Sequence, residues 1–205
     1  MSKPYSGIPI DEKRTWVVPR WLKEAFVAFA AVAVLAVGIS KAVQHFGGIA
    51  ERARSSLGAD ELDGRAAPAI KLPSRGGGQV DLAALRGKVV LVNFWATWCP
   101  PCIEEMPSLE KFARAYDVEV LAVSVDDGWE PVEKFLGKNT PFRVALDQGA
   151  KVSQIYGTTK FPESYLVDRD GKARLKFIGP RNWADPSFAA LLEPYGVKSL
   201  AQRRD

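Results

Sequence analysis

The sequence predicts an α/β fold in which a central mixed sheet is flanked by helices, preceded by one apolar N-terminal helix. Two patterns in residues 65–200 carry this prediction: apolar runs of strand length alternate with stretches in which apolar residues recur every three or four positions. Apolar residues make up 47% of the 205-residue chain, which is enough for one packed domain. That content excludes an intrinsically disordered chain.

The N-terminal region contains one uncharged apolar segment. Residues 25–40, AFVAFAAVAVLAVGIS, lie between Lys23-Glu24 and Lys41. A helix over this segment is about 24 Å long, slightly shorter than a hydrocarbon core of ~30 Å, and the flanking lysines can reach the interface. We therefore expect a transmembrane anchor over residues 24–41. A cleaved signal peptide and a buried core helix are the alternatives.

The residues that flank this segment predict its orientation and the domain boundaries. Five basic residues lie within residues 1–23, and Trp16 and Trp21 lie where an interfacial aromatic belt is expected. We therefore expect residues 1–23 in the cytoplasm and the C-terminal part outside it. The polar stretch 42–64, which contains Gly47-Gly48, predicts a linker. The folded domain is expected over residues 65–200, with a tail at 201–205.

The remaining elements follow from hydrophobic periodicity. After a hairpin-like opening at 68–82, the run VVLVNFW predicts a strand that is buried on both faces. Residues 103–116 have helical spacing, and Pro107 is expected to kink that helix. Further strands are expected at 118–125, 142–146, 164–167 and 174–178, and further helices at 132–136, 152–156 and 185–195. The turn at 168–171 makes the last two strands a hairpin.

Both cysteines of the chain lie in the motif Trp98-Cys99-Pro100-Pro101-Cys102, between a predicted strand and a predicted helix. Cys99 is thereby placed at a helix N-terminus, where free N–H groups and the helix dipole favour a thiolate. A structural disulfide is an alternative, but so short a loop constrains the unfolded chain little. The motif therefore predicts a redox-active dithiol.

A metal or cofactor is not expected at this motif. Tetrahedral zinc needs two more ligands, and His45, the only histidine, lies in the expected linker. Covalent haem attachment requires a histidine after Cys102, where Ile103 stands. The net charge of +4 forms no basic stripe, so a nucleic-acid partner is not expected either.

The segment VVLVNFWATWCPPCIEEMPSL, residues 89–109, resembles the active-site segment of membrane-anchored thioredoxin-like proteins of the TlpA/ResA type. The resemblance extends over residues 65–195 and implies a thioredoxin-like fold. It also implies a protein of the inner membrane that reduces disulfides of client proteins in the periplasm, for example in cytochrome c maturation or copper-site assembly. In this family the first cysteine attacks and the second resolves, which assigns these roles to Cys99 and Cys102. A membrane electron donor must then reduce the dithiol again.

The resemblance also assigns a proton-transfer group. Glu105 matches a glutamate that family members carry three residues after the second cysteine, and this spacing places it on the same helical face as Cys102. A carboxylate beside the dithiol can accept the resolving proton. Asn93 occupies the strand position at which thioredoxins proper have a buried acid, so this role is expected to pass to Glu105. A solvated helix carboxylate is the alternative.

Client binding is expected at Trp98, Phe161 and Pro162, with Glu163 as a further candidate. Trp98 is expected to shield the sulfurs, with plain packing as the alternative. Pro162 matches the cis-proline of the family, with a trans loop proline as the alternative. A cis bond there would leave backbone groups near Phe161 free to pair with an extended client segment. Phe161 and Glu163 are candidate client contacts.

The two prolines of the motif predict the direction of the redox reaction. Neither Pro100 nor Pro101 has an N–H to donate to the Cys99 sulfur, so thiolate stabilisation is weak and the couple is reducing. A different class of function is a Cu(I) delivery module that binds the metal through both thiolates, with Met106 as the one further soft side chain nearby. A non-catalytic interaction domain would not need both cysteines.

Overall fold

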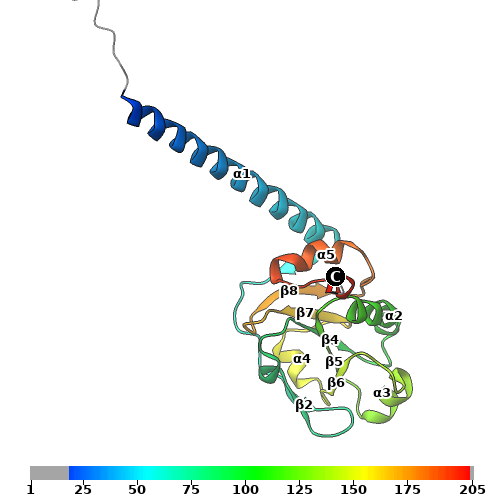
Figure 1. Cartoon of the computed structure of the whole chain (residues 1–205). Coiled ribbons are helices and arrows are strands. Elements are labelled where there is room, and N and C mark those ends of the chain that lie inside the picture. The colour runs from blue at the N-terminus through cyan, green and yellow to red at the C-terminus, as the bar shows by residue number, and fades with distance from the viewer. Residues whose placement is uncertain (1–18, 204–205) are drawn as a thin grey trace, which may run out of the picture. The chain divides into compact units, whose positions relative to one another are not determined.

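The computed structural model describes residues 19–203 (Figure 1). Residues 1–18 and 204–205 lie outside this range, and with them most of the expected cytoplasmic segment, including Trp16, and the end of the expected tail. The chain divides into two compact units, residues 1–45 and 46–205.

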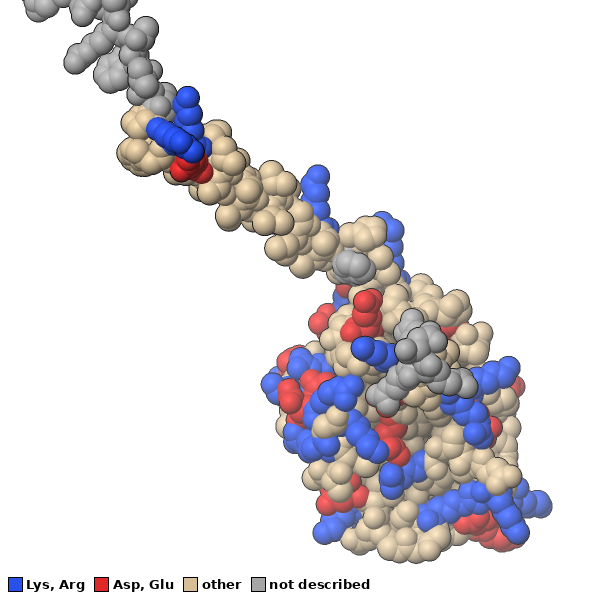
Figure 2. All heavy atoms as spheres, in the orientation of Figure 1, with Lys and Arg blue, Asp and Glu red and all other residues tan. Residues whose placement is uncertain are grey.

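Helix α1 (Arg20–Ser56) contains the apolar segment. Between residues 19 and 203 it is the one helix long and apolar enough to cross a membrane, with a mean hydropathy of 2.3 in its most apolar window. Phe26 and Phe29 are each 73% exposed, and no part of that window is buried. In Figure 2 the stretch of the helix between the charged side chains at its start and the next basic side chain carries no charge. The alternative of a buried core helix is therefore wrong, while a signal sequence shares this apolar character.

The expectation of a linker at residues 42–64 is wrong. Helix α1 continues to Ser56 through Gly47 and Gly48, and residues Ala59–Glu61 form strand β1. Ala53 and Leu57 are buried in the core of the second unit, four positions apart on one helical face. Arg54 pairs with Glu51 at 2.6 Å and with Glu61. The polar stretch is thus the solvent-facing side of a packed segment.

The second unit is built on a six-stranded mixed sheet with the order β1-β8-β7-β4-β5-β6. Strands β4 (Val90–Trp95), β5 (Glu119–Ser124) and the edge strand β6 (Arg143–Leu146) are parallel. Strand β7 (Glu163–Val167) runs antiparallel to β4 and forms the expected hairpin with β8 (Ala173–Ile178), which pairs with β1. The opening hairpin is β2 (Lys71–Pro73) with β3 (Gln79–Asp81). The mixed sheet is as predicted.

The helices agree with the sequence pattern apart from their ends. The α-helices are α2 (Pro100–Ala115), α3 (Trp129–Leu136), α4 (Lys151–Ile155) and α5 (Ser187–Leu192). Helix α2 continues through Pro107. The helix predicted at 185–195 is divided into α5 and the 3₁₀ turn η2 (Glu193–Tyr195). The remaining 3₁₀ turns are η1 (Leu82–Leu85), which follows β3, and η3 (Leu200–Arg203), which covers Leu200 and the first three residues of the expected tail.

Strand β4 is buried on both faces, which explains its continuous apolar sequence. Leu91 and Trp95 belong to the core that includes side chains of α2 and α5, whereas Val92 and Phe94 belong to the opposite core with η1 and the end of α4. Both cores hold the strand in register. The turn that follows Trp95 carries the cysteine motif, so its position is fixed by this strand.

We expect Phe112→Ala to lower the free energy of unfolding by about 3–5 kcal/mol, because the substitution opens a cavity in the α2 core. Phe112 is 1% exposed, and its ring contacts those of Trp183 and Phe188 at centroid distances of 5.5 Å. Urea unfolding followed by tryptophan fluorescence measures the change. Ile155→Ala is the control, since Ile155 is 67% exposed. Equal losses in the two variants would contradict the assignment of this core.

Candidate functional site

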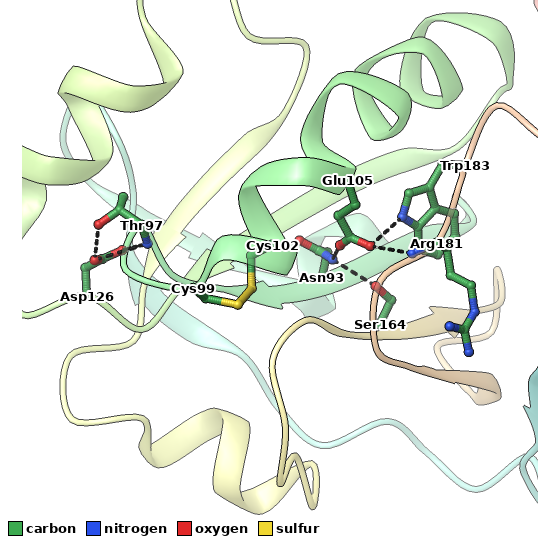
Figure 3. The surroundings of a disulfide bond; sticks show 9 residues. All are labelled: Asn93, Thr97, Cys99, Cys102, Glu105, Asp126, Ser164, Arg181 and Trp183. Atoms are coloured by element: carbon green, nitrogen blue, oxygen red, sulfur yellow. Dashed lines mark hydrogen bonds between the residues drawn. A yellow bond between two sulfur atoms is a disulfide. The ribbon is translucent and has the colours of Figure 1, made fainter.

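Cys99 and Cys102 form a disulfide at the start of α2, with their Cα atoms 5.3 Å apart (Figure 3). Cys99 is the N-cap residue of the helix and has an extended backbone, whereas Cys102 lies in the first turn. Cys99 is 6% exposed and Cys102 is completely buried. Of the two sulfur-bearing residues, only Cys99 therefore presents any surface to a reacting group.

The first turn of α2 offers the Cys99 sulfur little stabilisation. Pro100 and Pro101 have no N–H, as the sequence already showed. The next two N–H groups, of Cys102 and Ile103, donate to the carbonyl oxygen of Cys99 at 3.0 and 3.2 Å. The N–H groups that usually solvate an anion at a helix start are thus absent or occupied.

Glu105 lies one turn after Cys102 and is only 3% exposed. Its Oε1 accepts a hydrogen bond from Nδ2 of Asn93 at 2.8 Å. Its Oε2 accepts two more, from the backbone N–H of Arg181 at 3.0 Å and from Nε1 of Trp183 at 3.1 Å (Figure 3). The alternative of a solvated helix carboxylate is therefore wrong.

The surroundings of Glu105 change its acidity. Burial raises the pKa of this carboxyl group from 4.5 to about 7, and the hydrogen bonds from Arg181, Asn93 and Trp183 act in the opposite direction. A carboxyl group with this pKa is populated in both protonation states near neutral pH. It can therefore take up and release a proton during a reaction at the neighbouring dithiol.

Asn93 connects Glu105 to the sheet. It is completely buried in β4, and its Nδ2 also donates to the hydroxyl oxygen of Ser164 at 2.9 Å. Its Oδ1 is buried without a hydrogen-bond partner in the described part of the chain. Asn93 thus occupies the strand position expected from the sequence and acts there as a donor to the carboxylate of Glu105.

A surface cleft of about 360 Å³ lies on the side of Glu105 that faces the loop after β8. The lining residues come from α2 and from this loop: Glu104, Glu105, Ser108, Pro180, Arg181 and Asn182. Glu105 thus lies at the border between the interior of the domain and this cleft.

A second buried carboxylate fixes the turn that precedes the motif. Asp126 is 2% exposed and accepts hydrogen bonds from the backbone N–H of Thr97 at 3.0 Å and from its hydroxyl group at 2.6 Å. The Ser124 hydroxyl donates to the same carboxylate at 2.7 Å. These bonds hold the connection between β4 and Cys99. The sequence analysis did not identify Asp126, although it follows a buried strand that neighbours β4.

The residues expected to bind clients lie together beside the motif. Trp98 is 64% exposed, and its ring meets the edge of the Phe161 ring at a centroid distance of 6.0 Å. The Phe161–Pro162 peptide bond is cis, as predicted, so the trans alternative is wrong. The carbonyl group of Pro162 accepts from the Gly179 N–H at 2.9 Å.

Glu163 does not face clients, and its prediction as a contact residue is wrong. It is completely buried at the start of β7. Its Oε1 accepts a hydrogen bond from the Tyr165 hydroxyl at 2.5 Å and pairs with Nζ of Lys176 at 2.5 Å. A buried carboxylate that is paired in this way has a structural role.

Comparison with known proteins identifies the chain. Residues 62–192 match the Redoxin family, which is more than half of its length. The chain belongs to the redoxin family. The thiol-disulfide oxidoreductase ResA of Bacillus anthracis is 37% identical to this redoxin over 120 residues, which are 57% of this chain and 69% of that protein. The thiol:disulfide interchange protein CycY of Rhizobium leguminosarum bv. viciae is 36% identical over 100 residues, 48% of this chain and 54% of that protein.

Solved structures agree with the fold of this redoxin. A putative thiol:disulfide interchange protein DsbE from Chlorobium tepidum superposes with a TM-score of 0.58 and 31% identity, over 66% of this chain and 97% of that one. A putative thioredoxin from Neisseria meningitidis gives a TM-score of 0.52 and 36% identity, over 59% and 84%. The thioredoxin-like fold and the TlpA/ResA resemblance are thus confirmed. With its Cys99–Cys102 pair, the redoxin is a thiol-disulfide oxidoreductase.

The structure brings the predicted site residues of the redoxin together around the start of α2. Cys99, Cys102 and Glu105 lie within two turns of this helix, and Trp98 reaches Phe161 from the other side of the motif. The sequence analysis missed Arg181 and Trp183. Both lie in an irregular loop, where no periodicity or motif marks a residue that approaches α2.

We expect Glu105→Gln to change how stability depends on pH. The folded chain binds the Glu105 proton with a pKa of about 7, whereas the ordinary value is 4.5, so folding becomes less favourable as pH rises from 4.5 to 7. The penalty is absent at low pH and reaches about 3 kcal/mol above pH 7. Glutamine does not ionise and so removes this penalty. The unfolding free energy of Glu105→Gln should therefore increase relative to that of the wild type as pH rises from 4.5 to 7.

Urea unfolding of the oxidised protein at pH 5, 6, 7 and 8 measures this difference. Glu104→Gln is the matched control, because Glu104 is the adjacent glutamate and is exposed. The control should show the same pH profile as the wild type. Parallel profiles for Glu105→Gln and the wild type would show that the Glu105 carboxyl group is not held in an unfavourable environment.

Proposed function

We propose that this redoxin is an extracytoplasmic, membrane-anchored reductase of client protein disulfides. The observation that carries the proposal is the Cys99–Cys102 disulfide at the start of α2, one turn from a buried carboxyl group whose pKa is about 7. Cys99 is the nucleophile, Cys102 the resolving thiol and Glu105 the proton-transfer group. The start of α2 thus brings together the dithiol that donates two electrons and a carboxylate that can accept the proton of Cys102.

The reaction starts from the reduced dithiol. The Cys99 thiolate attacks one sulfur of the client disulfide, the client S–S bond breaks, and the other client sulfur leaves as a thiolate. Cys102 then loses its proton to the Glu105 carboxylate and attacks the Cys99 sulfur, which releases the second client sulfur. Two electrons pass to the client, and the Cys99–Cys102 disulfide is formed. A membrane electron donor of the dithiol class must reduce it again.

Client recognition rests on the exposed side of the motif. Trp98 and Phe161 offer an aromatic surface, and in the described residues no hydrogen bond engages the backbone N–H or carbonyl group of Phe161. An extended client segment can pair with this backbone beside Pro162, as in strand addition. The client disulfide then lies over Cys99.

The start of α2 favours a reductant over an oxidant. The first turn supplies no free N–H to the Cys99 sulfur, so the thiolate, and with it the reduced form, receives little extra stabilisation. A weakly stabilised dithiol gives up its electrons readily. The clients expected from the TlpA/ResA resemblance are proteins of cytochrome c maturation or copper-site assembly.

Helix α1 supports anchoring in the inner membrane. Arg20 and Lys23 lie before its apolar segment, together with the basic residues of the preceding chain, and this bias favours a cytoplasmic N-terminus. The domain from residue 46 onward is then periplasmic.

This topology predicts that a membrane-impermeant maleimide added to reduced, intact spheroplasts labels Cys99. Labelling only after lysis would place the dithiol in the cytoplasm.

The reductase activity is tested by turbidimetric reduction of insulin with dithiothreitol as electron source. Cys99→Ser should lose the catalysed rate, because the attacking sulfur is missing. Cys102→Ser should retain the first attack and accumulate mixed disulfides, which identify the clients by mass spectrometry.

A titration of the reduced protein with Cu(I) tests the alternative function. A wild type that binds one Cu(I) through both thiolates and reduces no disulfide would instead be a copper delivery module.

A further inference from the structure

The loop after β8, residues 179–183, holds one side of the Glu105 carboxylate. The backbone N–H of Arg181 and the indole Nε1 of Trp183 provide two of the three hydrogen bonds to this group. Ser108, one turn after Glu105 on α2, fastens the same loop. Its hydroxyl oxygen accepts from the Trp183 N–H at 3.1 Å, and it lies 3.3 Å from the Arg181 carbonyl oxygen. Hydrogen bonds to Glu105 and Ser108 therefore hold the loop against α2, the helix that carries the dithiol.

The side chain of Arg181 points away from Glu105 and binds the chain just after α1 (Figure 3). Its Nε donates to the carbonyl oxygen of Leu57 at 2.8 Å, and Nη2 donates to that of Gly58 at 3.1 Å. Nη1 donates to the carbonyl oxygen of Pro180 at 2.9 Å. One residue thus holds the Glu105 carboxylate with its backbone and the turn Leu57–Gly58 with its guanidinium group.

We propose that Arg181 and Trp183 are positioning residues of Glu105, and that Arg181 makes the protonation of Glu105 depend on the turn that ends helix α1. The proposal rests on the role of Glu105 in the proposed function. Its physical basis is that two of the three donors to the carboxylate belong to a loop that is held by Ser108 on one side and, through the Arg181 guanidinium group, by the Leu57 and Gly58 carbonyl groups on the other. Displacing that turn should weaken the hydrogen bonds at the active site.

The other side chains that contact Glu105 are neutral, so their charge does not determine its protonation state. Strand β4 contributes neutral Asn93, behind which lies neutral Ser164 of β7. On α2, Glu104 lines the same cleft as Glu105 and is exposed. Arg181 is the one cationic side chain in that cleft lining. Its charge favours the carboxylate form, so an experiment must separate the charge of Arg181 from its hydrogen bonds.

The role of Trp183 is tested in the oxidised full-length protein in lipid nanodiscs. Infrared spectroscopy of the carboxyl stretch, assigned by its loss in Glu105→Gln, follows the titration of Glu105. Trp183→Phe keeps the ring packing but removes the Nε1 donor, so the midpoint should rise by about one pH unit. Trp95→Phe is the matched control. Trp95 is also completely buried, but its Nε1 has no partner in the described residues, so the midpoint should not move.

The dependence on the end of α1 is tested at Gly58. This residue has a φ of +58°, and a Cβ there would lie 3.2 Å from Nη2 of Arg181, so Gly58→Ala should displace the guanidinium group and raise the Glu105 midpoint. Gly64→Ala is the matched control. Gly64 also has a positive φ, +71°, and its Cβ would meet the guanidinium group of Arg174, which donates to Asp168. The control should leave the midpoint unchanged.

Two substitutions of Arg181 separate hydrogen bonding from charge. Arg181→Lys keeps the charge but cannot span both carbonyl groups, and Arg181→Met loses charge and hydrogen bonds together. Positioning predicts a raised midpoint in both variants. A midpoint equal to the wild type in Arg181→Lys would overturn the dependence on α1, since charge alone would then explain the methionine variant. An unchanged midpoint in Trp183→Phe, or an equal rise in Trp95→Phe, would overturn the role of Trp183.

These measurements are independent of the proposed reaction. The titration is made on the oxidised protein without any client or reductant, so its outcome does not depend on disulfide reduction. Insulin reduction by the wild type and by Cys99→Ser tests the reaction separately. Unchanged titrations together with active reductase would refute the positioning proposal alone, and shifted titrations in an inactive protein would refute the proposed function alone.

Discussion

The burial of strand β4 between two hydrophobic cores is the constraint on which the site depends. Side chains at alternate positions of the strand are fixed from both faces, so its end cannot shift along the strand or rotate. Asn93 on this strand meets Glu105, and the turn after Trp95 delivers Cys99 to the start of α2. The packing of β4 therefore fixes where the start of α2 lies and supplies the Asn93 donor, while the helix itself sets the spacing of Cys99, Cys102 and Glu105.

The burial of Glu105 shows how packing changes the acidity of a side chain. An ionised carboxylate inside a protein is unfavourable unless it is hydrogen-bonded, and three donors from two separate segments compensate it only in part. The remaining cost appears as a pKa near neutrality. The same environment that weakens the fold at higher pH thus raises the pKa of the carboxyl group one turn from Cys102. In the proposed reaction, stability and proton transfer would depend on this one side chain.

The sequence was sufficient to predict the elements of the domain and the centre of the site, because both depend on local patterns. The apolar run before Trp98 defines β4, and the spacing of Cys99, Cys102 and Glu105 places all three at one helix end. Residues 42–64 were misinterpreted because their polar composition hides a helical face with Ala53 and Leu57. Glu163 was misplaced because its burial depends on Tyr165 and Lys176, which a linear pattern does not reveal.

The pairing of Cys99 with Cys102 within one turn also bears on how the chain matures. Cys99 and Cys102 are the sole cysteines, and they are bonded to each other. In an oxidising compartment an unfolded chain with many thiols can form scrambled bridges, which must be reshuffled before the native structure appears. This chain has no alternative pairing within itself. Oxidation of these two cysteines therefore cannot produce a scrambled intramolecular bridge.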